Sequence, residues 1–112
     1  MSARSGPALE EADVQRTAEA LRDERGQALL VDVREPDEWR AGRARGARHV
    51  PLRELPDELE SLPRGAAVYL ICRSGSRSHT AAAYLKQAGF ERPINVRGGM
   101  LAWERAGLPV ER

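Results

Sequence analysis

Short apolar runs along the chain have the pattern of β-strands that are buried on both faces. Val68–Ile71 is continuously apolar and rich in β-branched and aromatic side chains, as expected of a strand covered by helices on both sides. Ala28–Val33 is a second run of this kind, interrupted near its carboxyl end by an acid. Val50–Leu52 and Ile94–Val96 are shorter candidates. These runs are typical of strands in a parallel sheet.

Segments with apolar side chains at helical spacing lie between these runs, and most are bounded by a residue that can begin or end a helix. We expect helices in the segments Asp13–Gly26, Pro36–Gly42, Leu55–Leu62, Ser78–Gly89 and Gly99–Gly107. Gly98 and Gly99 suit a close backbone approach at the start of the last helix. Met100, Leu101 and Trp103 are expected to pack behind it. Strands that alternate with helices predict an α/β fold with a mostly parallel central sheet flanked by helices on both faces.

Length and charge limit what the chain can be. A chain of 112 residues suits one domain, and no repeat, linker or low-complexity segment divides it. We expect a flexible N-terminus at residues 1–8, interrupted by Gly6-Pro7, and a single domain at residues 9–112. With 18 basic and 17 acidic side chains, the net charge of +1 gives no general attraction to nucleic acid or to a membrane. No apolar stretch suits a membrane span or a signal peptide, so we expect a cytoplasmic protein.

The cysteine and histidine content limits the chemistry. A single cysteine, Cys72, excludes an internal disulfide. With only His49 and His79 beside it, the chain has no credible zinc-binding spacing. We therefore expect no metal site.

Cys72 lies where the Val68–Ile71 run ends and a polar loop begins, and the carboxyl edge of a parallel sheet is where α/β proteins bind ligands. If the loop curls around the sulfur and leads into a helix, its backbone N–H groups point partial positive charge at Cys72, and Arg73 and Arg77 add full charges. Lowering the pKa of a thiol by about two units takes about 2.7 kcal/mol, which several charge-assisted hydrogen bonds can supply. We therefore predict a thiolate at neutral pH instead of an inert core cysteine.

The same loop offers an anion site. The guanidinium groups of Arg73 and Arg77 suit the oxygens of a sulfonate, phosphate or carboxylate group. The loop also carries the hydroxyl donors Ser74, Ser76 and Ser78. Gly75 lets the loop curl with its amides inward. A nucleophile inside an anion site predicts group transfer from an anionic donor.

Three stretches resemble the signatures of the rhodanese-like sulfurtransferases, in the order in which that family has them. Cys72–Ser78 reads Cys-Arg-Ser-Gly-Ser-Arg-Ser, the form of the active-site loop in single-domain thiosulfate sulfurtransferases. Asp32–Trp39 fills the amino-terminal signature, Asp-Val-Arg-Glu-Pro-x-Glu followed by an aromatic residue. Asn95–Trp103 and Ala106–Val110 resemble the carboxyl-terminal signature. The resemblance spans about Asp13 to Val110.

The resemblance implies a rhodanese-like fold and a sulfurtransferase without a cofactor. In this family, the cysteine thiolate takes the outer sulfur of thiosulfate or a similar anionic donor and holds it as a persulfide for a thiophilic acceptor. By this resemblance, Cys72 carries the sulfur, Arg73 and Arg77 bind the donor oxygens, and the loop amides and serine hydroxyls stabilise the sulfur anions. The acceptor is expected to be cyanide in an assay and a thiol in a cell, for example on a thioredoxin-like protein.

Two alternatives stay open at this point. Related phosphatases and arsenate reductases of the same fold have five residues between cysteine and arginine. This chain has four between Cys72 and Arg77, which by the family's rule favours sulfur transfer. The second alternative is a non-catalytic module for sulfur relay or protein binding.

Residues near the loop have both a structural and a functional interpretation. Asp32 either accepts hydrogen bonds from the backbone or from Arg34 at a strand end, or orients the loop or an arginine as a supporting residue. His49 and His79 are more typical of a turn and of a solvated helix position than of a catalytic base. Arg97 either widens the positive rim of the site or is solvated.

Overall fold

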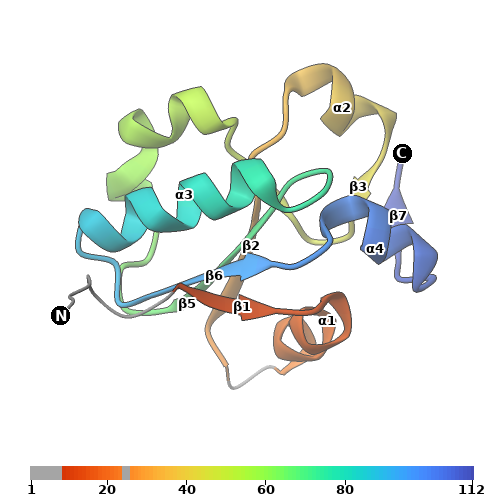
Figure 1. The fold of residues 1–112 in the computed structure, drawn as a ribbon, viewed down its shortest axis with the longest axis horizontal. Helices are drawn as coiled ribbons and strands as arrows, with labels where there is room; N and C mark the ends of the chain where they lie inside the picture. The colour runs from red at the N-terminus through yellow and green to blue at the C-terminus, as the bar shows by residue number, and fades with distance from the viewer. Residues whose placement is uncertain (1–8, 24–25) are drawn as a thin grey trace, which may run out of the picture.

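The computed structural model describes residues 9–23 and 26–112, and its centre is a five-stranded sheet in the order β1-β6-β5-β2-β4 (Figure 1). Every neighbouring pair of strands in this sheet is parallel. The strands are β1 (Glu10–Ala12), β2 (Ala28–Asp32), β4 (Arg48–His49), β5 (Ala67–Ile71) and β6 (Arg92–Val96). β3 (Arg43–Ala44) and β7 (Val110–Glu111) form a separate antiparallel pair. The N-terminus expected to be flexible, residues 1–8, lies outside the described residues.

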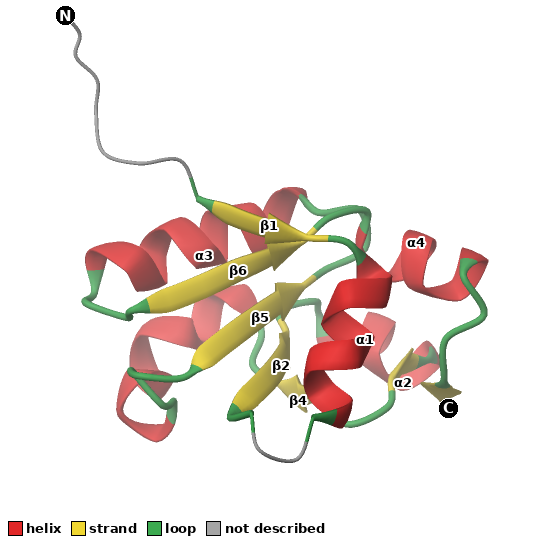
Figure 2. Cartoon of the chain, turned by 90° about the horizontal axis from the view of Figure 1, so that it is seen from below, coloured by secondary structure: helices red, strands yellow, loops and turns green. Residues whose placement is uncertain are grey.

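Helices cover both faces of the sheet. They are α1 (Val14–Arg22), α2 (Pro36–Ala41), α3 (Ser76–Gln87), α4 (Gly99–Arg105) and the 3₁₀ helix η1 (Leu52–Ser61). Figure 1 shows α3 and η1 above the sheet and α1 below it. Figure 2 shows the arrowheads of β5 and β6 directed toward the end of the molecule where α4 lies. The predicted α/β fold with a parallel sheet between helices is therefore confirmed.

Side chains alternate across β5 and divide the core into two clusters. Val68 and Leu70 belong to the cluster that includes buried residues of α3 and η1. Tyr69 and Ile71 belong to the cluster formed with α1 and α4. Successive side chains of a strand point to opposite faces, so Cys72 continues the first series and lies on the α3 side of the sheet.

The first helix begins where the sequence predicts and ends earlier. Asp13 caps α1, and its carboxylate accepts a hydrogen bond from the backbone N–H of Arg16 at 2.8 Å. The helix ends at Arg22 and does not extend to Gly26. The N–H of Gly26 donates to the carbonyl of Asp23 at 3.0 Å.

Two details of α3 and α4 also differ from the sequence prediction. α3 begins at Ser76 and not at Ser78, because Gly75 has a positive φ of 113° and ends the loop as the N-cap residue. Leu101, expected to pack behind α4, is 40% exposed. Trp103, on the opposite side of this short helix, is buried as predicted.

The strand expected at Val50–Leu52 lies instead at Arg48–His49. The N–H of Val50 donates to the carbonyl of Asp32 at 2.9 Å and that of Leu52 to the adjacent carbonyl of Val33 at 3.0 Å, so the regular two-residue spacing of the ladder is lost after Val50. The segment that follows is a 3₁₀ helix, and Pro56 inside it lacks an N–H that an α-helix would use. Leu55, part of the predicted apolar stripe, is fully buried.

The start of α4 lies against the loop that follows β5. The backbone N–H of Met100 donates to the carbonyl of Cys72 at 2.8 Å. The N–H of Leu101 donates to the next carbonyl, that of Arg73, at 3.1 Å. A Cβ at Gly99 would lie 2.4 Å from the carbonyl oxygen of Cys72. The close backbone approach predicted for this pair of glycines is confirmed, and it holds the loop in place.

Gly99→Ala should destabilise the fold more than Gly46→Ala. Both glycines have positive φ, 60° and 83°, and an alanine in such a conformation costs about 1–2 kcal/mol. Only the first substitution also forces a methyl group into backbone carbonyls, which costs roughly a further 1–3 kcal/mol, whereas nothing lies within 4 Å at Gly46. Urea unfolding should give the lower midpoint for Gly99→Ala. Equal midpoints would contradict the tight packing of α4 against the loop.

Candidate active site

The predicted loop lies at the carboxyl edge of the sheet. Cys72 directly follows β5, and Asp32 ends the neighbouring β2, where it pairs with Ile71. From Cys72 the chain turns at Gly75 and enters the 12-residue helix α3. The sulfur is therefore near the N-terminus of α3, where the helix dipole favours a negative charge.

The sulfur of Cys72 is enclosed by protein and contacted by hydrogen-bond donors. The residue is 0% exposed. Its Sγ accepts hydrogen bonds from the backbone N–H of Gly75 at 3.1 Å and from the hydroxyl of Ser78 at 3.2 Å. Burial alone would raise the pKa of Cys72, but the Ser78 hydroxyl and the backbone N–H groups of Ser78, Gly75 and Ser74 lower the pKa below its usual value. These are the surroundings of a stabilised thiolate.

The two arginines of the loop are in different situations. Arg77 is half-buried, and its guanidinium group binds the Glu38 carboxylate through two hydrogen bonds of 2.7 and 2.9 Å. Arg73 is exposed, and within residues 9–23 and 26–112 it has no ion pair. An anion from solvent can therefore reach Arg73 directly, whereas Arg77 is held by a carboxylate.

Glu38 is a residue of this site to which the sequence analysis gave no functional role. It lies in the first turn of α2, and its Oε1 also accepts the backbone N–H of Glu35 at 2.9 Å. The hydrogen bonds from Arg77 are the main reason that the pKa of Glu38 is lowered to about 2. The available signal was its position inside Asp32–Trp39, one of the stretches that resemble a family signature.

Asp32 accepts hydrogen bonds from the backbone and from Arg34 at the end of its strand, as the structural one of its two interpretations predicted. It is fully buried, and its carboxylate accepts bonds from the backbone N–H, Nε and Nη2 of Arg34 at 2.8–3.0 Å. The same Nη2 donates to the carbonyl of Gly42 at 2.7 Å. His49 Nε2 lies 2.8 Å from the carbonyl oxygen of Arg34, and its ring stacks on Trp39 at 4.6 Å. Asp32 thus fixes the turn around α2, the helix that presents a carboxylate to the loop.

Asn95 is a second residue that the sequence analysis missed. It is only 2% exposed in β6, and its Oδ1 lies 2.6 Å from Oγ of Ser78. Its Nδ2 donates to Oε2 of Glu11 at 3.0 Å and to the carbonyl of Gly75 at 3.2 Å. The available signal was the single polar residue inside the apolar run Ile94–Val96, because a buried amide needs hydrogen-bond partners. Asn95 connects the loop to the sheet.

The remaining predicted residues lie at the surface. Ser74, Ser76 and His79 are exposed. Arg97 is also exposed, and it lies 3.8 Å from the carboxylate of Glu11. Within the described part of the chain, none of these side chains hydrogen-bonds the sulfur.

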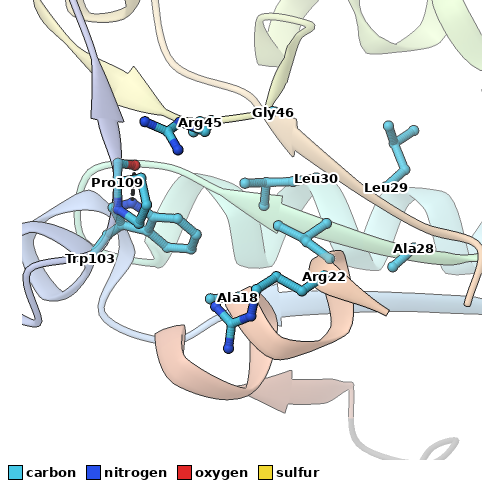
Figure 3. A pocket seen from close by; sticks show the side chains of 10 residues that line it. Ala18, Arg22, Ala28, Leu29, Leu30, Arg45, Gly46, Trp103 and Pro109 are labelled. Carbon is cyan, nitrogen blue, oxygen red and sulfur yellow. Dashed lines mark hydrogen bonds between the residues drawn. The ribbon is translucent and has the colours of Figure 1, made fainter. Parts of the chain in front are cut away.

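A cavity of about 400 Å³ lies away from this site (Figure 3). Ala18, Leu30 and Trp103 contribute apolar lining, and Arg22 and Arg45 lie on either side of it. None of its lining residues comes from the loop of residues 72–78. The sulfur is therefore not part of this cavity.

The described residues contain no group of three or more His, Cys, Asp or Glu side chains placed to hold a metal ion. Over the same ranges, no helix has the length and apolar character needed to cross a membrane.

Comparison with known proteins agrees with the signatures in the sequence. The model of the rhodanese-like domain matches residues 14–106. A sulfurtransferase of Allochromatium vinosum is 44% identical over 82 residues, which cover 73% of this chain and 77% of the relative. The thiosulfate sulfurtransferase GlpE of Vibrio cholerae is 36% identical over 94 residues, which cover 84% of this chain and 88% of the relative.

Solved structures have the same fold. A rhodanese-related protein from Thermoplasma volcanium superimposes with a TM-score of 0.82 at 28% identity, covering 92% of this chain and 98% of that one. A rhodanese-like domain protein from Staphylococcus aureus gives a TM-score of 0.81 at 29% identity, covering 93% and 100%.

Glu38→Gln should change how stability depends on pH. The pKa of Glu38 is lowered from 4.5 to about 2 in the folded protein, so its ion pair stabilises the fold above pH 4.5 and is lost as the pH falls toward 2. At neutral pH the variant should be less stable than the wild type by up to about 1 kcal/mol, since both side chains are partly exposed. Urea unfolding at several pH values should show this difference shrinking on acidification.

Glu104→Gln is the matched control, because Glu104 is an exposed carboxylate of α4 without an ion pair in the described ranges. Its stability should follow that of the wild type at every pH. A Glu38→Gln difference that stays constant down to pH 2 would contradict the role of the ion pair.

Proposed function

Because the chain belongs to the family of rhodanese-like domains, we propose that it is a sulfurtransferase that carries a sulfane sulfur on Cys72. The observation that carries this proposal is the Cys72 sulfur, which accepts hydrogen bonds from the Gly75 N–H and the Ser78 hydroxyl. Such donors favour the thiolate, which is the nucleophilic form of cysteine. The names of the relatives, sulfurtransferase and thiosulfate sulfurtransferase, support the same reaction class.

The first half-reaction loads the sulfur. The Cys72 thiolate attacks the outer sulfur of thiosulfate or a similar donor, and a new S–S bond forms. The S–S bond of the donor breaks, and sulfite leaves with its electron pair. Cys72 is then a persulfide whose negative charge lies on the outer sulfur, and the loop N–H groups stabilise this charge.

The charged groups of the loop bring the donor to the sulfur. Arg73 is exposed and offers its guanidinium group to the oxygens of an anionic donor. Arg77 contributes positive charge while Glu38 fixes its position through two hydrogen bonds. A donor must reach a sulfur that is 0% exposed, so loading requires groups around the sulfur to move aside.

The second half-reaction unloads the sulfur to a nucleophile. A thiolate or cyanide attacks the outer sulfur, and the Cys72 thiolate leaves as the restored nucleophile. We propose a cellular thiol, or a protein thiol such as that of a thioredoxin-like protein, as the natural acceptor. The cytoplasm suits such acceptors because thiols there are kept reduced.

Intact mass spectrometry tests the loading step. The protein is incubated with thiosulfate, desalted and weighed beside Cys72→Ser. The wild type should gain the mass of one sulfur atom, and a thiol or cyanide added afterwards should remove it. A wild type that gains no sulfur from thiosulfate or from several other sulfane donors would contradict the proposal.

Cys72→Ser serves as the matched control because it is nearly isosteric and lacks the nucleophilic sulfur. It should keep the wild-type mass after the same incubation. An aryl phosphate assay covers the alternative enzyme class, a cysteine-dependent phosphatase or arsenate reductase. Cys72-dependent hydrolysis without sulfur uptake would replace the proposed function with that alternative.

A further inference from the structure

Two acceptors compete for one hydroxyl group beside the candidate nucleophile. Oγ of Ser78 lies 2.6 Å from Oδ1 of Asn95 and 3.2 Å from Sγ of Cys72. Ser78 is fully buried and Asn95 is 2% exposed, so both side chains depend on partners within the protein. A serine hydroxyl has a single proton, and it can donate to only one of these atoms at a time.

The orientation of the Asn95 amide follows from its other partners. Its second terminal atom lies 3.0 Å from Oε2 of Glu11 and 3.2 Å from the carbonyl oxygen of Gly75. A carboxylate and a carbonyl only accept hydrogen bonds, so the atom facing them is Nδ2, the donor. The atom facing Ser78 is therefore Oδ1, which can only accept.

We infer that Asn95 is a positioning residue for Cys72: it accepts the hydrogen bond of the Ser78 hydroxyl while the sulfur is protonated, and that hydroxyl donates its hydrogen bond to the sulfur instead once the sulfur is an anion. The inference deepens the proposed function because it concerns the same sulfur. Its test reads ionisation and not sulfur transfer, so the two can fail separately.

The two arrangements differ in the direction of the Ser78 O–H bond and in whether Cys72 carries its own proton. With a neutral thiol, the S–H of Cys72 donates to Oγ of Ser78, and the Ser78 hydroxyl donates to Asn95. When Cys72 ionises, its proton leaves for solvent or a base, and the Ser78 hydroxyl turns toward the sulfur. Ser78 keeps its own proton throughout.

Loading the sulfur reverses the change. In a persulfide the negative charge lies on the outer sulfur, so the inner Sγ becomes a weaker acceptor. The Ser78 hydroxyl then returns to Asn95. The hydroxyl direction thus follows the charge on Cys72, and Asn95 favours the states in which Sγ is neutral.

Several charged groups surround this sulfur, and they contribute to its ionisation whether Ser78 is present or not. Arg73 and Arg77 come from the loop and from α3, and Glu38 of α2 is paired with the second of them. Glu11 of β1 is connected to Ser78 and the sulfur through the side-chain amide of Asn95, which donates a hydrogen bond to its carboxylate. A test of the inference must therefore separate the contribution that passes through Ser78 from these background charges.

A double-mutant cycle makes this separation. The ultraviolet absorbance of the thiolate is titrated in the wild type, Asn95→Leu, Ser78→Ala and the double variant, each against a Cys72→Ser baseline. Leucine approximates the size of asparagine and removes the acceptor. The Gly75 carbonyl keeps a donor in the N–H of His79 at 3.2 Å.

The expected result is a coupling between the two positions. Asn95→Leu removes the acceptor that competes with the sulfur for the Ser78 hydroxyl. In the protein that has Ser78, this substitution should therefore raise the ionisation constant of Cys72. The increase should be roughly three- to tenfold larger than the change that the same substitution causes in Ser78→Ala. A general effect of burying leucine near the sulfur appears in both backgrounds and cancels. If Asn95→Leu shifts the titration equally with and without Ser78, or opposes the thiolate only when Ser78 is present, the inference is wrong.

A second variant keeps the test decisive if Asn95→Leu does not fold. Asn95→Ala removes the same acceptor with a smaller side chain and should give a coupling of the same sign. Sulfur uptake is measured on the same samples. Normal coupling without uptake contradicts only the proposed function, and normal uptake without coupling contradicts only the role of Asn95.

Discussion

A buried sulfur anion needs hydrogen-bond donors, and this requirement explains most of what surrounds Cys72. Removing a thiolate from water raises its pKa, and here the Ser78 hydroxyl and the backbone N–H groups of the loop outweigh that effect. The donors must be held in position before the charge forms, because a flexible loop would lose conformational entropy each time it closed on the sulfur. The rest of the site therefore consists largely of contacts that hold the loop.

Each of these contacts comes from a different part of the sheet edge. The start of α4 binds the carbonyls of Cys72 and the following residue through backbone N–H groups, and Gly99 allows that approach. Glu38 holds Arg77, and the buried Asp32–Arg34 pair fixes the turn that carries α2. Asn95 reaches the loop from β6. The anion-binding loop is thus supported by several neighbouring elements and not by the strength of any single bond.

The sequence predicted the parts of this arrangement that are local along the chain. Continuous apolar runs indicated buried parallel strands, and the position of Cys72 after one of them located the site. The ion pair of Glu38 with Arg77 joins residues far apart in sequence, and no periodic pattern indicates such a partner. Very short strands such as β1, β3 and β7 form because they pair with distant segments of the chain. They are too short to show a repeating pattern of apolar and polar residues in the sequence. The strand expected at Val50–Leu52 was misplaced because the position of β4 is set by its pairing with Val31 and Asp32 of β2, and not by that apolar run.

The central claim is that folding makes the Cys72 sulfur easier to ionise although folding also buries it. The most direct measurement is the ultraviolet titration of the thiolate in the native protein and in the same protein unfolded in urea, each against Cys72→Ser. We expect the native protein to have its midpoint at a lower pH than the unfolded protein. A native midpoint equal to or above the unfolded value would mean that burial outweighs the donors, and it would contradict the account.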